Sequence, residues 1–307
     1  MIELEIFIIA IAQGIGEFLP ISSSGHNAVL NHLFERFGDP LTADSNEFVK
    51  LNILLHVGSL IAVLVVFRQR VVDLLGKDRR LIPMLIVATI PAGLALLSIK
   101  MCKVDWIQNY LPLISVCFIG TGILLLITLR TSEGEKTCST MTWTDALIIG
   151  FAQAIAVLPG LSRSGTTIVT GLLCRLKREE AATFSFLLAI PVIGGGGLFA
   201  CLDMMKELTP SDSPISNEFL LLGALVSCIT GIIALIFLLD WLKKGKLWYF
   251  ALWVFMMAPI TLALAFLPMP ETSEPVQTPV EVQAVDNSCT PQHANKPAFY
   301  PPIIPQG

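Results

Sequence analysis

The chain has 307 residues, of which 54% are hydrophobic and 14% are charged, and its mean hydropathy is +0.72. A soluble domain carries roughly 25% charged residues, so this composition excludes an ordinary soluble fold and predicts a membrane protein. The net charge of −4 averages membrane segments, loops and tail, so it says little about partners. No nucleic-acid partner is expected. Seven scattered cysteines show neither paired spacing nor a CxxC motif, so neither a disulfide framework nor a zinc site is expected.

Apolar segments recur along most of the chain. Six are long enough to cover a hydrocarbon layer of ~30 Å at about 1.5 Å per residue, and they cover residues 51–67, 81–99, 111–129, 184–202, 219–239 and 247–267. Residues 3–18 and 145–158 are too short to cross alone, and a loop rich in Pro, Ser and Gly follows each of them. Such loops are tolerated at membrane depth only inside protein or beside a wet cavity. The expected fold is therefore an all-α polytopic membrane protein with six transmembrane helices plus two re-entrant helical hairpins.

Lysine and arginine gather on one side of this arrangement. Thirteen lie in the loops at 68–80, 130–145, 175–180 and 240–246, whereas four lie in the loops and tail of the opposite side. The basic side should be cytoplasmic. Three spans separate the two hairpins, so the second hairpin should enter from the opposite face, as in an inverted-topology repeat.

A sequence repeat supports this topology. Residues 12–25, AQGIGEFLPISSSG, return 140 positions later as AQAIAVLPGLSRSG at 152–165. The identical positions are Ala12/Ala152, Gln13/Gln153, Ile15/Ile155, Ser22/Ser162, Ser24/Ser164 and Gly25/Gly165. We expect one membrane domain over residues 1–267, with repeat one at about 1–130 and repeat two at about 140–267. Residues 268–307 hold nine of the nineteen prolines and are expected to form a disordered extracytoplasmic tail.

The first loop has the composition of a phosphate site. Ser22, Ser23, Ser24 and Gly25 precede a new helix, where hydroxyls and backbone N–H groups favour an anion. Alternatively, these serines only cap the helix. His26 follows directly and could attack phosphorus itself, or it could move a proton for a water or a serine.

Two further side chains lie on one face of the segment before this loop. Gln13 and Glu17 are four residues apart, and their oxygens are hard ligands suited to Mg²⁺ or Ca²⁺. Glu17 could instead be a general base or a structural partner of Arg163.

The second loop contributes the cation. Arg163 is expected at membrane depth, where a guanidinium needs an anionic partner and fits phosphate oxygens; the alternative is a structural tether to Glu17. Ser162, Ser164, Gly165 and Thr167 complete the expected phosphate-binding set. Asn52 and His56 are secondary candidates that could line the cavity or could hydrogen-bond between helices.

The segments QGIGEFLPISSSGH (13–26) and LPGLSRSGTT (158–167) resemble the undecaprenyl-diphosphate phosphatase family of the bacitracin-resistance type, over about residues 1–267. The family's motif positions fall on Gln13, Glu17, Ser22, Ser23, Gly25, His26, Pro159, Gly160, Ser162, Arg163, Ser164 and Thr167. The resemblance implies a divalent-metal-dependent enzyme of the bacterial inner membrane with a site open to the extracytoplasmic side. Gln13 departs from the Glu of many members, and His56 departs from a common Gln.

The expected function is hydrolysis of undecaprenyl diphosphate to undecaprenyl phosphate and inorganic phosphate, which recycles the carrier for cell-wall synthesis and confers bacitracin resistance. The expected catalytic residues are His26, Glu17, Ser23 and Arg163, and the nucleophile is left open between His26, Ser23 and water. Expected partners are the lipid substrate, the membrane and a second copy in a homodimer. The alternative function is a polyprenyl-phosphate flippase or secondary transporter, which uses the same broken-helix architecture.

Overall fold

The computed structural model describes residues 2–36, 46–206 and 217–267, and the predicted tail at 268–307 lies outside the described residues. Apart from an isolated bridge between Lys136 and Leu176, the regular secondary structure of the described part is helical, and the helices are joined by turns and loops. In chain order the elements are α1 (Ile2–Phe18), α2 (Ser23–Arg36), α3 (Asn46–Val66), α4 (Arg68–Leu75), α5 (Leu81–Met101), η1 (Asp105–Asn109), α6 (Leu111–Ile127), η2 (Thr128–Arg130), α7 (Trp143–Ile155), α8 (Arg163–Leu173), α9 (Arg178–Lys206), α10 (Asn217–Lys243) and α11 (Tyr249–Phe266). The all-α prediction is confirmed.

The described residues hold five or six candidate spans where six are expected. Among the described residues, five helices are long and apolar enough to cross a membrane, namely α5, α6 with η2, α9, α10 and α11. Helices α3 and α4 would make a sixth span if counted together, but the chain bends by 77° between Val66 and Arg68. Arg68 and Arg70 explain this bend, because charged side chains cannot continue into hydrocarbon at low cost.

Helix α5 illustrates how one span serves both lipid and protein. Ile86, Ile90 and Leu94 recur every four residues and are exposed, so they form a stripe suited to lipid. Ala88 and Ala92 lie between these positions and are buried. Their small side chains let α7 approach α5 closely, which is the usual basis of helix contact in a bilayer.

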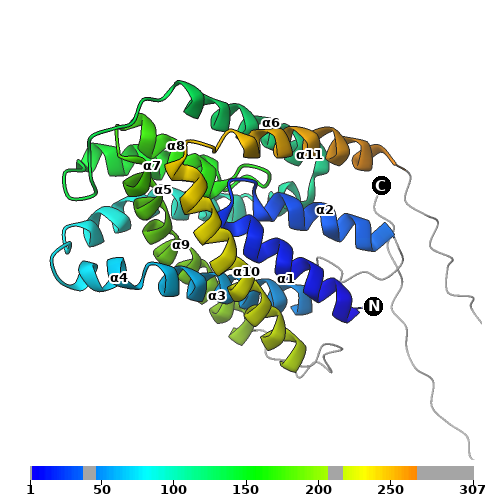
Figure 1. Cartoon of the computed structure of the whole chain (residues 1–307). Coiled ribbons are helices and arrows are strands. Elements are labelled where there is room, and N and C mark those ends of the chain that lie inside the picture. The colour runs from blue at the N-terminus through cyan, green and yellow to red at the C-terminus, as the bar shows by residue number, and fades with distance from the viewer. Residues whose placement is uncertain (1, 37–45, 207–216, 268–307) are drawn as a thin grey trace, which may run out of the picture. The chain divides into compact units, whose positions relative to one another are not determined.

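The two halves of the chain exchange packing partners. Helix α1 of the first half packs against α10 of the second, and α7 of the second half packs against α5 of the first. Helices α6 and α11 lie side by side (Figure 1). A glycine permits each exchanged contact: a Cβ on Gly14 would overlap the Ser227 carbonyl of α10, and one on Gly150 would lie 2.7 Å from the Ala88 carbonyl oxygen of α5.

This packing brings together the loops that end α1 and α7. The helices end at Phe18 and Ile155, and the chain restarts as α2 at Ser23 and as α8 at Arg163. Ser22 Oγ accepts a hydrogen bond of 3.1 Å from the backbone N–H of Gly160. Residues 138 positions apart in the sequence thus become neighbours, and the site lies at this contact.

Candidate functional site

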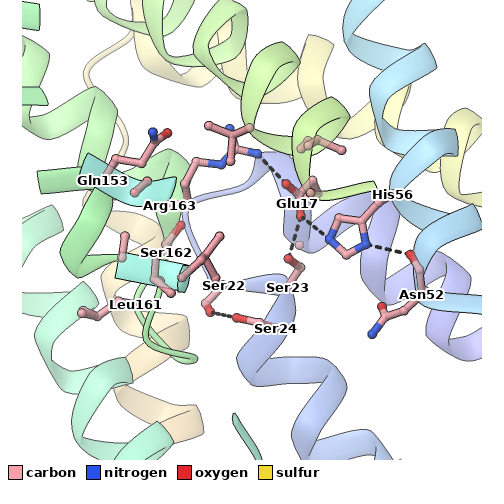
Figure 2. A pocket seen from close by; sticks show the side chains of 18 of the residues that line it. Glu17, Ser22, Ser23, Ser24, Asn52, His56, Gln153, Leu161, Ser162 and Arg163 are labelled. Atoms are coloured by element: carbon pink, nitrogen blue, oxygen red, sulfur yellow. Dashed lines mark hydrogen bonds and ion pairs between the residues drawn. The ribbon is translucent and has the colours of Figure 1, made fainter. Parts of the chain in front are cut away.

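A cavity of about 440 Å³ lies at the contact between the two loops (Figure 2). Its lining includes a polar group made of Glu17, Ser22, Ser23, Ser24, Ser162 and Arg163. It also includes apolar side chains from α3, α9 and the second loop, among them Ile53, Val157, Leu161, Val192 and Ile193. A molecule that fills this cavity therefore meets both charge and hydrocarbon.

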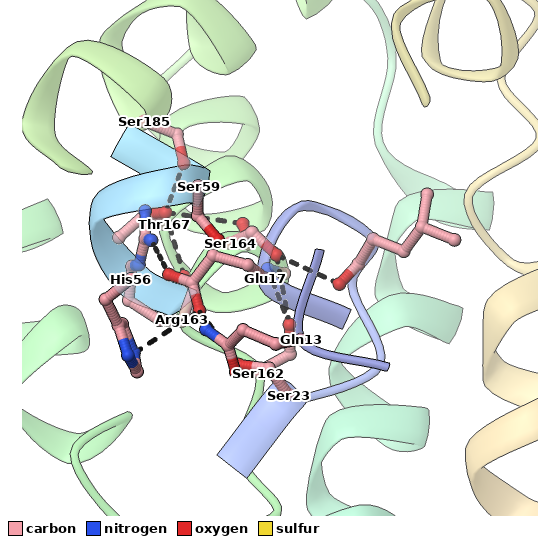
Figure 3. A network of polar contacts seen from close by, with 12 residues as sticks. Gln13, Glu17, Ser23, His56, Ser59, Ser162, Arg163, Ser164, Thr167 and Ser185 are labelled. Carbon is pink, nitrogen blue, oxygen red and sulfur yellow. Dashed lines mark hydrogen bonds and ion pairs between the residues drawn. The ribbon is translucent and has the colours of Figure 1, made fainter. Parts of the chain in front are cut away.

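Glu17 is the centre of the polar group (Figure 3). Its side chain is 9% exposed and accepts hydrogen bonds on both oxygens. Arg163 Nη2 donates to Oε1 at 2.5 Å, while Ser23 Oγ donates to Oε2 at 2.8 Å. Gln13 Nε2 also donates to Oε2, at 3.1 Å. A buried carboxylate needs such donors to stay ionised, and here they come from both repeats.

The first loop is held by Ser22, whose φ of 70° lies in the left-handed region. Its Oγ accepts the N–H of Gly25 at 3.3 Å as well as that of Gly160, and it lies 3.3 Å from Ser24 Oγ. Ser22 therefore caps α2, as the capping alternative predicts, while Ser22, Ser23 and Ser24 also line the cavity.

The second loop repeats this capping pattern. Ser162 Oγ accepts the N–H of Gly165 at 3.1 Å and lies 3.2 Å from Ser164 Oγ. Thr167 donates to the carbonyl oxygen of Arg163 at 2.9 Å and lies beside Ser185. Seven residues were expected to bind phosphate. Of these, Ser22, Ser24 and Ser162 line the cavity, and the other four do not, namely Gly25, Ser164, Gly165 and Thr167.

Arg163 forms the tether to Glu17 that the sequence offers as the alternative, but only one of its terminal nitrogens takes part. Nη1 is buried and has no hydrogen-bond partner among the described residues. A buried guanidinium nitrogen without an acceptor is costly, so this N–H group indicates an anionic ligand. Arg163 can thus hold Glu17 and a phosphoryl oxygen at the same time.

His26 is not among the residues that line the cavity. Trp253 of α11 donates its indole N–H to His26 Nε2 at 2.9 Å, and His26 Nδ1 lies 2.8 Å from the carbonyl oxygen of Ser22. An indole only donates and a carbonyl only accepts, so the neutral ring carries its proton on Nδ1. Both ring nitrogens are therefore engaged, and His26 reaches a substrate only if the bond to Trp253 opens.

The imidazole that does line the cavity belongs to His56 of α3. Its Nε2 lies 4.0 Å from Glu17 Oε2, and its Nδ1 bonds the carbonyl oxygen of Asn52 at 2.8 Å. The sequence marked Asn52 and His56 as secondary candidates, and the structure places both beside the cavity (Figure 2).

The expected metal ligands do not present two oxygens to one ion. Gln13 Oε1 accepts from Asn27 Nδ2 at 2.8 Å, so Gln13 turns its nitrogen toward Glu17. Across the described residues, no group of three His, Cys, Asp or Glu side chains could hold a metal. These two residues would therefore offer an ion one carboxylate, and its remaining ligands would have to come from water or from substrate phosphates.

Two residues with evident contacts at the site were not among the predicted site residues. Trp253 of α11 donates a hydrogen bond to His26. Gln153 lines the cavity, and the signal that could have found it was its match to Gln13 in the repeat.

Comparison with known proteins matches the same region. The sequence profile described as "Bacitracin resistance protein BacA" matches residues 6–260. The chain is 40% identical over 250 residues to a protein of Rhodopirellula baltica named "Undecaprenyl-diphosphatase", a match that covers 81% of this chain and 93% of that protein. A protein of Alkaliphilus metalliredigens with the same name is 35% identical over 286 residues, covering 87% of this chain and 100% of the relative. A third protein with this name, from Treponema denticola, is 38% identical over 274 residues, covering 84% of this chain and 94% of the relative. The chain therefore belongs to the BacA family of bacitracin resistance proteins.

Proposed function

We propose that this protein hydrolyses undecaprenyl diphosphate to undecaprenyl phosphate and inorganic phosphate, the activity that its relatives' names state. The observation that carries the proposal is the guanidinium of Arg163. Its Nη2 bonds Glu17, whereas its buried Nη1 has no partner among the described residues and can bind an anion. In a bacterium this activity recycles the lipid carrier of cell-wall synthesis and confers bacitracin resistance.

The substrate would lie along the cavity according to its two chemistries. The terminal phosphates enter the polar group, where Arg163 and the N-termini of α2 and α8 favour negative charge. The first isoprene units lie against Ile53, Val192 and Ile193 and leave toward the bilayer. Gly196 also lines this part, and nothing lies within 4 Å of a Cβ added there, so the wall is open at that point.

Glu17 and Ser23 form the reacting pair in this proposal. The hydroxyl of Ser23 already donates to Glu17, so the carboxylate can accept its proton when Ser23, or a water in its place, attacks the terminal phosphorus. Arg163 stabilises charge that develops on the phosphoryl oxygens. Ser23 and water are favoured over His26 as nucleophile because His26 is bonded to Trp253 outside the cavity lining.

The membrane arrangement is part of the same proposal. The exchange of partners between α1 with α10 and α7 with α5 supports two re-entrant hairpins in an inverted repeat within one domain over 1–267. The distribution of Lys and Arg supports an extracytoplasmic opening of the site, with the tail on that side.

A divalent cation, Mg²⁺ or Ca²⁺, enters the proposal only as an ion that arrives with the diphosphate. The protein offers it one carboxylate, Glu17, and such ions are commonly bound by one or two carboxylates together with substrate phosphates. Addition of a chelator to the purified enzyme should abolish phosphate release if this is correct; full activity in the chelator would contradict it.

The direct test measures phosphate release from undecaprenyl diphosphate by purified wild type and by Glu17→Gln. Wild type should release phosphate, and the variant should lose at least about 100-fold, since it lacks the proton acceptor. A folded wild type that binds and translocates the lipid without releasing phosphate would contradict the proposal and favour the flippase alternative.

A further inference from the structure

The repeat places glutamines at matched positions, Gln13 on α1 and Gln153 on α7, and the structure uses them differently. Both ends of the Gln13 amide are bonded, the oxygen to Asn27 and the nitrogen to Glu17. The nitrogen of Gln153 donates to the carbonyl oxygen of Ala88 at 3.4 Å, but Oε1 is buried and has no partner among the described residues. Gln153 is 1% exposed and lines the cavity, which Gln13 does not.

The packing of α7 on α5 fixes the direction of the Gln153 amide. The carbonyl of Ala88 can only accept, so the amide nitrogen must face it and the oxygen is left unpaired. Gly150, one turn earlier, lets the two backbones approach closely at the same Ala88. Rotation of the amide would turn its oxygen toward the Ala88 carbonyl oxygen, so this hydrogen bond favours the direction in which Oε1 stays unpaired.

A complementary unpaired group lines the same cavity. Arg163 Nη1 is a buried donor without an acceptor, and Gln153 Oε1 is a buried acceptor without a donor. In the view of Figure 2, Arg163 lies between Gln153 and Glu17. A buried polar group without a partner is destabilising unless a ligand satisfies it, so the pair indicates a ligand that both accepts and donates hydrogen bonds.

The two atoms require two different ligand groups, an acceptor for Arg163 Nη1 and a donor for Gln153 Oε1. Phosphoryl oxygens are acceptors and suit Arg163 Nη1, but they cannot bond an amide oxygen. A water molecule can donate to Gln153 Oε1 and keep a lone pair for phosphorus. Hydrolysis consumes one water, and none of the other polar groups of the cavity is a buried acceptor left unpaired among the described residues.

We propose that Gln153 Oε1 binds and orients the water that hydrolyses the phosphoryl group, while Arg163 Nη1 holds an oxygen of that group. The inference rests on the proposed function. The water oxygen forms a bond to phosphorus, and the bond from phosphorus to the departing oxygen breaks. That oxygen belongs to prenyl phosphate in direct attack, or to Ser23 if Ser23 has first accepted the phosphoryl group. It takes the proton that the water loses, and inorganic phosphate is released.

The test compares full-length wild type with Gln153→Leu and Gln153→Asn in detergent. Both variants should lower kcat for undecaprenyl diphosphate by about 100-fold, as expected when a reacting group is misplaced, with the dissociation constant of a farnesyl methylene-diphosphonate changing by less than about twofold. In methanol–water mixtures the ratio of methyl phosphate to inorganic phosphate should rise, because water loses its oriented position. A merely structural role would not change this ratio. Gln69→Leu on exposed α4 is the matched control for the substitution itself.

The outcomes separate this inference from the function on which it rests. Unchanged kcat and product ratio in both variants, with an active wild type, would overturn the role of Gln153 and leave the phosphatase intact. A loss of analogue affinity equal to the loss of kcat/KM would also overturn it, because Gln153 would then serve binding. A wild type that releases no phosphate would overturn both. Gln153→Asn keeps a polar amide, so the test stands even if Gln153→Leu does not fold.

Discussion

The two loops of the site share the same capping hydrogen bonds at the start of the next helix, but they carry different reactive side chains. Ser22 and Ser162 each accept the N–H of the glycine three residues later, and each lies within 3.3 Å of the serine two residues later. The position between those serines differs, being Ser23 in one loop and Arg163 in the other, and both side chains bond Glu17. The identical positions therefore build two similar helix starts, while the divergent positions supply a hydroxyl and a cation to one carboxylate.

Substitution of Arg163 should lower the activity more than any other change at the two loops. Arg163→Ala removes the anion-binding N–H and leaves Glu17 buried without its cation, so kcat/KM for undecaprenyl diphosphate should fall about 10³-fold. Arg163→Lys keeps the charge without the planar fork and should lie between wild type and Ala. Steady-state phosphate release measures both, with folding checked by thermal melting. Equal activity of the Ala variant and wild type would show that the second loop supplies no chemistry.

The next largest effect distinguishes Ser23 from His26 within the first loop. Ser23→Ala should lower kcat by about 10²–10⁴-fold, whereas His26→Ala should cost less than about tenfold, because only Ser23 lines the cavity and bonds Glu17. Trp253→Phe should be measured beside His26→Ala, because it keeps an aromatic ring but removes the N–H that binds His26. If His26→Ala proves the more damaging change, the bond to Trp253 must open during turnover.

A third difference between the loops lies in how each chain turns. The position of Pro20 in the first loop is taken by Gly160 in the second, where φ is +93° and a Cβ would lie 2.5 Å from the Ile114 carbonyl oxygen. Gly160→Ala should lower the free energy of unfolding by about 2–4 kcal/mol from strain and overlap. Gly93→Ala on α5 is the control, because Gly93 is exposed and nothing lies within 4 Å of a Cβ added there. Comparable denaturation midpoints for the two variants would contradict this account.

The sequence predicts the helices better than the contacts between them. The predicted arm at 3–18 and span at 81–99 correspond to α1 (Ile2–Phe18) and α5 (Leu81–Met101), because long apolar runs specify helices in a membrane. Helix α4 lies in a segment predicted as loop, since eight residues with two arginines give no span signal.

The same limit applies at the site. Contact between Glu17 and Arg163 could be predicted as an alternative, because two buried opposite charges need one another. The bond between His26 and Trp253 could not, since it joins residues 227 positions apart and depends on where α11 packs. The unpaired oxygen of Gln153 likewise depends on the approach of α7 to α5, which no local pattern encodes.

The smallest predicted effect concerns the two capping serines that the loops share. Ser162→Ala removes one cap and should lower the free energy of unfolding by about 1 kcal/mol. Ser22→Ala should cost about 2 kcal/mol, because Ser22 Oγ also accepts the N–H of Gly160 and its loss leaves that buried group unpaired. Denaturation of both variants in matched detergent measures the difference. Because the Ser22 bond joins the two loops, its loss should also loosen the cavity and raise KM, whereas loss of the Ser162 cap should act on stability more than on KM. Equal effects of the two changes would mean that each loop holds its shape independently and that the contact between them contributes little.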